Sequence, residues 1–262
     1  MTAARPLAGK HAVVTGGSRG IGRAVAARLG AMGATLTLVG RDEAALAVAA
    51  SALGAATRCD WRACDVGDGA AVARTFAEIT GRGEGLAILV NNAGAAKSAK
   101  FAATEPALWD EMLRINLTGV YHCTRAALPA LLAAAHGRIV NIASTAGLAG
   151  YPYVAAYCAA KHGVVGLTRA LALELATTGV TVNAVCPGYT ETDLVREAVA
   201  NIAARTGQSA DAARAALAAR NPQGRLVTPD EVAGAVAWLC LPESQAITGQ
   251  AIAVAGGEVA AG

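Results

Sequence analysis

The sequence predicts an α/β protein built on one doubly wound parallel sheet, with a helical lid at one end. Three observations lead to this fold class. Short apolar runs rich in β-branched residues alternate with helical patterns along the chain. A glycine-rich turn directly follows the first run, and residues 190–222 are alanine-rich and helical between two strand-like segments. No repeat or linker divides the chain, so we expect a single domain over residues 1–262.

Composition and charge narrow the functional classes. The chain is 54% hydrophobic and 16% charged, as is typical of a well-buried globular protein. Its net charge of +3 includes no basic block and gives no case for nucleic-acid binding. No apolar run reaches membrane-spanning length and no signal-peptide pattern is present, so we expect a cytoplasmic protein with no membrane partner. The six cysteines lack metal-site spacing, so we expect reduced thiols and no metal.

The first strand is expected at residues 11–15, and it ends directly in the turn T-G-G-S-R-G-I-G at 15–22. A helical pattern follows from Arg23. Strand, glycine turn and helix in this order form the Rossmann-type unit, in which a pyrophosphate sits at the helix N-terminus. A glycine-rich turn without a ligand is the alternative. The residues expected to line a nucleotide here are Thr15, Gly16, Ser18, Arg19, Gly20, Ile21 and Gly22.

The end of the second strand, at 35–39, bears on the choice of nucleotide. A ribose 2′-hydroxyl favours a carboxylate at this place, whereas a 2′-phosphate favours arginine. Arg41 is the first side chain beyond the strand and its glycine, and Arg19 is available from the glycine turn. We therefore favour NADP over NAD. Asp42 leaves NAD possible, because it could pair with Arg41 or accept a hydrogen bond from the ribose.

The remaining elements continue the alternation of strands and helices, so functional loops should lie beyond the carboxyl ends of the strands. A further helix begins at Thr228, with Thr228 as its N-cap. The expected ranges are a helix to about 53, a strand near 57–60, a helix at 68–80, a strand at 86–90, helices at 105–116 and 118–135, a strand at 138–142, a helix at 155–177, and strands at 181–185 and 250–254.

The stretch from Ser144 to Lys161 carries the most specific chemistry. Tyr157 and Lys161 are four residues apart, so they share one face of a helix. A phenol has an ordinary pKa of about 10, and we expect the nearby ammonium to lower it. The hydroxyl of Ser144 could bind a carbonyl oxygen that Tyr157 protonates, which suits a ketone/alcohol pair. An amphipathic helix with one snorkelling lysine is the alternative.

Five motifs in register then support one family. The chain resembles the short-chain dehydrogenase/reductase family over essentially its whole length. The resemblance implies a catalytic tetrad in which Tyr157 is the acid/base, Ser144 orients the carbonyl, Lys161 assists the tyrosine and holds a ribose, and Asn116 holds a water. The motifs are T-G-G-S-R-G-I-G at 15–22, N-N-A-G at 91–94, N-L-T-G at 116–119, S-x12-Y-x3-K at 144–161 and P-G-Y-T-E-T at 187–192.

The same resemblance implies further cofactor contacts and an assembly. Asp65 and Val66 would contact adenine, and Asn92, Ala93 and Gly94 would line the cofactor. The loop after the strand at 181–185 would hold the nicotinamide carboxamide. The family usually forms homotetramers through its two long middle helices and the C-terminal strand region. The residues implied for the carboxamide are Pro187, Gly188, Thr190 and Thr192.

Within the family, the motifs are similar to those of 3-oxoacyl-thioester reductases and polyketide ketoreductases. We therefore expect an NADP(H)-dependent enzyme that interconverts a ketone and a secondary alcohol, with a 3-oxoacyl thioester as the substrate class. Ala133–Ala135 and Leu173 stand where carrier-dependent members have basic residues, which favours coenzyme A over a carrier protein. Lys97 and Lys100 could meet coenzyme A phosphates or could simply be solvated.

Other readings stay open from the sequence. They are a polyketide-type or small aryl/alkyl ketone reductase, an NAD-dependent hydroxyacyl-CoA dehydrogenase and, remotely, a dinucleotide-binding regulator without activity. The chain also has Ala255 where the family often has aspartate.

Overall fold

The computed structural model describes residues 5–83 and 85–259. Within them, parallel strands form one seven-stranded sheet in the order β3-β2-β1-β4-β5-β6-β7. This confirms the predicted doubly wound sheet. The order reverses between β1 and β4, so the loops after these two strands diverge there. The strands are β1 His11–Thr15, β2 Thr35–Gly40, β3 Cys59–Ala63, β4 Leu86–Asn91, β5 Arg138–Ile142, β6 Thr181–Pro187 and β7 Ala251–Val254.

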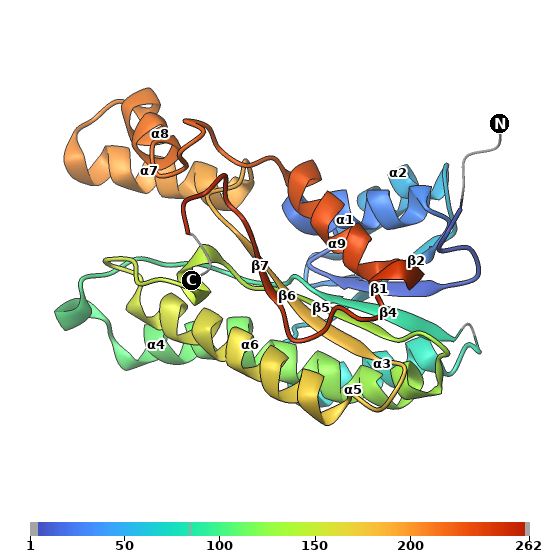
Figure 1. Cartoon of the computed structure of the whole chain (residues 1–262). Coiled ribbons are helices and arrows are strands. Elements are labelled where there is room, and N and C mark those ends of the chain that lie inside the picture. Colours follow the sequence, from blue (N-terminus) through green and yellow to red (C-terminus); the bar gives the residue numbers. More distant parts are fainter. Residues whose placement is uncertain (1–4, 84, 260–262) are drawn as a thin grey trace.

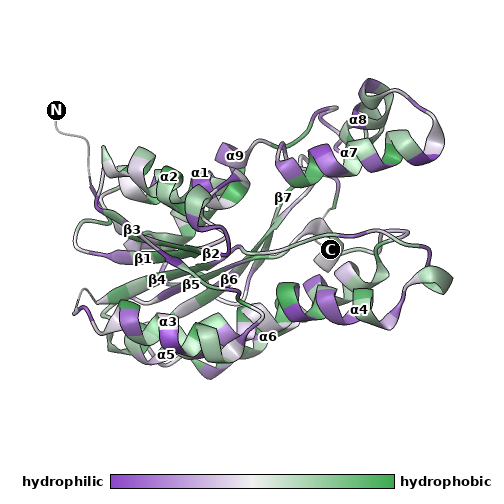
Figure 2. Ribbon diagram, turned by 180° about the vertical axis from the view of Figure 1, so that it is seen from behind, coloured by the Kyte–Doolittle hydropathy of each residue, from purple (hydrophilic) through white to green (hydrophobic). Residues whose placement is uncertain are grey.

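Helices cover both faces of the sheet, as Figure 1 shows. Side chains alternate between the two faces of a strand. Val14 therefore packs with the helices that cover one face of the sheet, and Val13 packs with those that cover the other. In Figure 2 the strands are mostly green, whereas the helices have mixed colours. One face carries α1 Gly20–Ala31, α2 Glu43–Gly54 and α9 Pro229–Cys240, and the other carries α3 Gly69–Thr80, α5 Gly119–Ala133 and α6 Ala155–Glu174.

Several element boundaries differ from the sequence-based prediction. The strand expected near 57–60 is β3 at Cys59–Ala63, because the Thr57 hydroxyl donates to the Ala34 carbonyl (2.6 Å) in the turn before it. The helix expected at 155–177 ends at Glu174. The helices expected at 105–116 and 118–135 are α4 Pro106–Leu113 and α5, joined by a π-helical turn at Arg114–Thr118. Strand β6 runs two residues further than expected, to Pro187.

The predicted lid, residues 190–222, contains two helices, α7 Asp193–Thr206 and α8 Ala210–Ala218. They project beyond the carboxyl end of the sheet, on the side of α1 and α9 (Figure 1). Val195 of α7 and Leu217 of α8 form a small apolar cluster with Leu226, which follows the lid. The helical content of the lid is confirmed, and its mobility stays a prediction.

A chain of buried polar side chains ties the centre of the sheet to its lower helices. Asn91 Nδ2 donates to Thr124 Oγ1 and to Asn141 Oδ1, each at 2.9 Å. Asn141 Nδ2 donates in turn to Thr168 Oγ1 at 2.9 Å. These bonds join β4, β5, α5 and α6 in a buried region, where an unmade bond would be costly. They fix the register of the elements that carry the residues described below.

The glycine turn leaves no room for a side chain at Gly22. A Cβ there would lie 2.2 Å from the Gly16 carbonyl oxygen and 2.4 Å from Asn92 Nδ2. Gly22→Ala should therefore lower the free energy of unfolding by about 1–3 kcal/mol, the usual cost of overpacking. Gly234, inside α9, has no atom within 4 Å of an added Cβ, so Gly234→Ala should raise it by about 0.5–1 kcal/mol. Urea unfolding of both variants checks this, and a Gly22→Ala variant as stable as wild type would contradict it.

Candidate active site

Hydrogen bonds clasp the loops after β1 and β4 together at the point where the strand order reverses. Thr15 Oγ1 accepts from the backbone N–H groups of Asn92 (2.9 Å) and Ala93 (3.0 Å). Asn92 Nδ2 donates to the carbonyl oxygens of Thr15 (2.9 Å) and Gly16 (3.1 Å). Gly16 has a φ of 65°, which favours glycine. The two predicted loops thus form one surface.

The N-terminus of α1 is open at this surface. Arg19 occupies the N-cap position without a side-chain cap, and no acidic residue stands in the first turn. In contrast, Asp42 caps α2 by accepting from the Ala45 N–H at 3.0 Å. Ser18 is half-buried in the turn, and Ile21 packs against the core. Uncapped N–H groups and the positive end of the helix dipole suit an anionic group.

The two arginines predicted to bind a 2′-phosphate are both exposed. Arg41 lies at the end of β2, where its charge helps to lower the pKa of Asp65. Arg19 forms an ion pair with Asp193 of the lid at 3.6 Å. Asp42, the residue that left NAD open, uses one carboxylate oxygen to cap α2.

Asp65 and Val66 lie in the loop after β3. Asp65 accepts from the Gly67 N–H (2.9 Å) and from Arg114 (3.0 Å). Burial works to raise the pKa of Asp65, but these bonds and the arginine charges outweigh it and lower the pKa below its ordinary value. Val66 is buried against Gly119, where a Cβ would lie 2.8 Å from a Val66 methyl group. The loop is therefore held rigidly against the start of α5.

Asn116 sits in the π-helical turn and is completely buried. Its Nδ2 donates to the carbonyl oxygens of Ala95 (2.9 Å) and Met112 (3.0 Å), and its Oδ1 accepts from the Ala95 N–H (3.2 Å). A Cβ on Gly94 would lie 2.9 Å from Asn116 Oδ1 and 3.8 Å from Lys161 Nζ. Gly94 thus allows the asparagine and the lysine to approach the same loop.

Ser144 follows β5 in an extended conformation and caps the next short turn, because its Oγ accepts from the Ala146 N–H at 3.1 Å. Tyr157 lies near the start of α6 and is half-buried. Burial raises the pKa of Tyr157 to about 12, while a hydrogen bond with Ser144 acts in the opposite direction. The phenol is therefore protonated at neutral pH and can donate a proton.

Lys161 lies one turn further along α6 and is 4% exposed. Its ammonium donates to the Ile142 carbonyl oxygen at 2.8 Å and is 5.7 Å from the centre of the Tyr157 ring. Burial lowers the pKa of Lys161 to about 8. The expectation that this ammonium lowers the pKa of Tyr157 is wrong for this structure, because burial of the phenol dominates and the lysine is bonded to the backbone of β5.

The loop after β6 closes the far side of the same edge. Gly188 N–H donates to the Val254 carbonyl oxygen (3.1 Å), and Thr190 Oγ1 donates back to the Gly188 carbonyl oxygen (2.9 Å). Thr192 is the N-cap residue of α7, and its Oγ1 donates to the Thr190 carbonyl oxygen (3.2 Å). A Cβ on Gly20 would lie 3.2 Å from the Thr192 methyl group, so this loop meets the glycine turn.

The predicted residues therefore lie in the loops beyond the carboxyl ends of β1 to β6 and on the helices that follow those loops. A model of the family described as short chain dehydrogenase matches residues 10–203. The chain belongs to this family. As a short-chain dehydrogenase it is an oxidoreductase.

Three similar proteins narrow the comparison. A proposed ketoacyl reductase of the granaticin polyketide synthase of Streptomyces violaceoruber is 42% identical over 98% of this chain and 94% of the relative. A proposed ketoacyl reductase of Streptomyces coelicolor is 43% identical over 94% of this chain and 95% of the relative. The crystal structure of an actinorhodin polyketide ketoreductase variant with NADPH superposes with a TM-score of 0.92 at 41% identity, over 97% and 98% of the two chains.

Four side chains beside this short-chain dehydrogenase site were missed by the sequence reasoning. They come from the loop after β5, the two ends of the lid and the segment after β7, and through Tyr151 they contact Thr145, the neighbour of Ser144; they are Tyr151, Tyr189, Arg220 and Glu258. No spacing in the sequence joins residues this far apart. The only signal was the presence of Tyr151 inside the stretch from Ser144 to Lys161.

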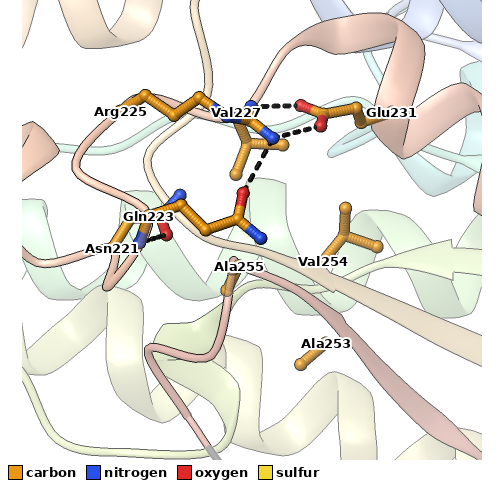
Figure 3. A pocket seen from close by; sticks show the side chains of 9 residues that line it. Asn221, Gln223, Arg225, Val227, Glu231, Ala253, Val254 and Ala255 are labelled. Atoms are coloured by element: carbon orange, nitrogen blue, oxygen red, sulfur yellow. Dashed lines mark hydrogen bonds and ion pairs between the residues drawn. The ribbon is translucent and has the colours of Figure 1, made fainter.

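A separate cavity of ≈ 210 Å³ lies where the end of the lid meets the segment after β7 (Figure 3). It is lined by Ala255 and by Asn221, whose buried Nδ2 has no partner among the described residues. Arg225 forms an ion pair with Glu231 on the opposite wall at 2.6 Å. The small side chain of Ala255 thus leaves room in this wall.

The described residues include no group of three or more His, Cys, Asp and Glu side chains that could hold a metal ion. None of the described helices is long and apolar enough to cross a membrane. The six cysteines all lie within the described residues and are free thiols, as expected.

The low pKa of Lys161 gives a pH-dependent contribution to stability. The pKa is about 8 in the folded protein, against 10.5 ordinarily, so between these values the unfolded chain binds more protons. The free energy of unfolding contributed by this residue therefore rises with pH from 8 to 10.5. Relative to Lys161→Met, the wild type should gain stability over this window. Urea unfolding of both proteins between pH 7.5 and 10 checks this, and a difference independent of pH would contradict it.

Proposed function

We propose that this protein is an NADPH-dependent ketoreductase that reduces the 3-oxo group of an acyl thioester, as polyketide-type ketoacyl reductases do. The observation that carries the proposal is the position of Tyr157, which is hydrogen-bonded to Ser144 and whose ring centre lies 5.7 Å from the ammonium of the buried Lys161. Such a site can donate a proton to a carbonyl oxygen. The ketoacyl reductases among the similar proteins supply the substrate class.

The nucleotide surface has the features that NADPH requires. The uncapped N-terminus of α1 and the cradle at Gly22, which a Cβ would fill, suit a pyrophosphate. Arg41 and Arg19 supply two cations for a 2′-phosphate. Asp65 and Val66 would border the adenine, and the loops at 92–94 and 187–192 would border the nicotinamide. NADPH, when bound, supplies the hydride for the reduction.

The residues of this chain would orient the substrate, donate the proton and hold the cofactor. Ser144 Oγ orients the carbonyl oxygen of the substrate, and Tyr157 gives its proton to that oxygen. Lys161, with its pKa near 8, is suited to restore the proton and to hold the ribose. Asn116 has its amide bonded to the backbone of Ala95 and Met112, so its role is to hold the loop that lines the cofactor and the lysine.

We propose coenzyme A as the carrier of the acyl group. Where carrier-dependent relatives resemble one another in being basic, this chain has Ala133–Ala135 and Leu173, which is 80% exposed. These positions offer an acidic carrier protein no cation, although the exposed Arg169 lies one helical turn before Leu173. Of the two lysines in the loop after β4, Lys97 binds Glu111 at 2.6 Å, which leaves Lys100 as the better phosphate contact.

We further propose a single cytoplasmic domain that assembles as a homotetramer. Exposed apolar and small side chains on α5 and α6 support the assembly, because such faces pack closely against a second copy. These residues are Tyr121, Leu132, Ala159, Ala170 and Leu173.

Tyr157→Phe should lower kcat by about 10²–10⁴-fold, because the proton donor is lost while the ring remains. The assay follows NADPH oxidation with acetoacetyl-CoA and with the same acyl group on a carrier protein, and we expect the higher kcat/KM with coenzyme A. Tyr153→Phe, an exposed tyrosine in the same stretch, is the matched control and should retain activity. Equal turnover in wild type and Tyr157→Phe would refute the proposal.

Arg41→Asp should weaken NADPH binding by about 10- to 150-fold, the effect of losing a charge-assisted contact of roughly 1.5–3 kcal/mol. NADH binding should change little. Fluorescence titration of both nucleotides measures the two Kd values. Arg74→Asp makes the same change of charge on the exposed side of α3 and should leave both values unchanged. A wild-type protein that binds NADH as tightly as NADPH would instead indicate that Asp42 contacts the ribose.

A further inference from the structure

A buried carboxylate joins three segments of the chain at the mouth of the site. The side chain of Glu258, in the segment after β7, is 5% exposed. Its Oε1 accepts from the Tyr151 hydroxyl at 2.8 Å and from Arg220 Nε at 2.9 Å. A Cβ on Gly188 would lie 3.0 Å from the other oxygen, Oε2. Glu258 therefore touches the loop after β5, the end of the lid and the loop after β6.

Each partner of this carboxylate is itself connected to the proposed site. The Tyr151 hydroxyl accepts from Thr145 Oγ1 at 2.8 Å, and Thr145 is the neighbour of Ser144. The guanidinium of Arg220 stacks over the Tyr151 ring, 4.3 Å from its centre. Tyr189 meets the same ring edge-on, with the ring centres 6.4 Å apart. The arrangement links the serine loop directly to the C-terminal end of the lid.

The cluster keeps its hydrogen bonds across the neutral pH range. Burial is the main reason that the pKa of Tyr151 is raised to about 12, with Glu258 adding to it and Thr145 opposing it. The hydrogen bond to Glu258 raises the pKa of Arg220 above its ordinary value. The phenol therefore remains a donor and the guanidinium remains a cation.

Apart from this cluster, the described residues hold the lid by a backbone pairing between its first residues and Val227 and by the following contacts. Its apolar side chains pack mainly with one another, around Val195 and Leu217. Its ion pair with the glycine turn, between Asp193 and Arg19, spans 3.6 Å and leaves the arginine 72% exposed. Exposed pairs of this kind contribute little, whereas a buried carboxylate with two donors is costly to disrupt.

We propose that Glu258 is a positioning residue that latches the lid to the serine loop and thereby sets the affinity for the ketone substrate. The proposal rests on the proposed function, because it concerns the substrate of that site. Substrate binds the closed arrangement, so its apparent affinity is proportional to the fraction of the protein in which the lid is closed. Loss of the latch lowers this fraction and therefore lowers the affinity. The chemistry within the closed complex is unchanged by the latch.

Glu258→Gln keeps the size of the side chain and removes its charge. It should raise KM for acetoacetyl-CoA by about tenfold with kcat within about twofold of wild type, the signature of lost uniform binding. The Kd for NADPH should stay unchanged. Amide hydrogen exchange in α7 and α8 should become faster, while exchange in the strands of the sheet stays the same.

Two further variants separate a latch from a general loss of stability. Tyr151→Phe keeps the ring and removes one donor, so KM should rise by about threefold. Arg220→Gln alone should raise KM about as much as Glu258→Gln, and the double variant should add nothing further, because both break the same link. Arg214→Gln breaks an exposed ion pair with Glu191 inside the lid and should leave KM unchanged.

The outcomes distinguish this proposal from the proposed function. If wild type does not oxidise NADPH with the ketone and Tyr157→Phe is no different, the proposed function fails and the latch fails with it. If wild type is active and Glu258→Gln has the wild-type KM, the latch alone is refuted. The latch alone is also refuted if Glu258→Gln lowers kcat, raises KM and weakens NADPH binding together. Additive effects of Glu258→Gln and Arg220→Gln would also overturn it.

Discussion

The clasp between Thr15, Gly16 and Asn92 is the constraint on which the site depends. A doubly wound sheet separates its loops where the strand order reverses, and this separation creates the place for a ligand. Left to themselves, the two loops would diverge, with unpaired backbone groups between them. The side chains of Thr15 and Asn92 pair those groups at 2.9–3.1 Å. The absence of a side chain at Gly22 makes this approach possible.

Hydrogen bonds between buried polar groups connect this clasp with α6. The amides of Asn91 and Asn141 join β4 and β5 to the helices below, and Asn116 holds the next loop. Lys161 ends the series at the Ile142 carbonyl. A buried lysine costs free energy, and here it is held by one backbone oxygen beside a half-buried phenol. Burial thus moves the two pKa values in opposite directions, that of Lys161 down to about 8 and that of Tyr157 up to about 12.

The sequence predicted what short-range patterns encode. Alternating strands and helices, the glycine turn, and the spacing of Ser144, Tyr157 and Lys161 led to the sheet and to one cluster of residues. Asn116 had no local signal and came from family resemblance. The edge strand β3 was misplaced because Trp61 and Arg62 do not form an apolar run. The direction of the Tyr157 pKa shift depends on burial, which the spacing of residues in the sequence does not reveal. The hydrogen bond from Tyr151 to Glu258 spans 107 residues, so no local pattern predicts it.

The small apolar cluster of the lid has an evolutionary consequence. Since Val195, Leu217 and Leu226 pack with one another rather than with the sheet, substitutions among them are compensated locally. Effects at distant sites add rather than couple. Substitutions within this cluster should therefore leave the nucleotide surface and the tyrosine–lysine pair as they are. In a fold of this kind, changes in the side chains of the lid can alter the choice of substrate without changing the residues proposed for proton transfer.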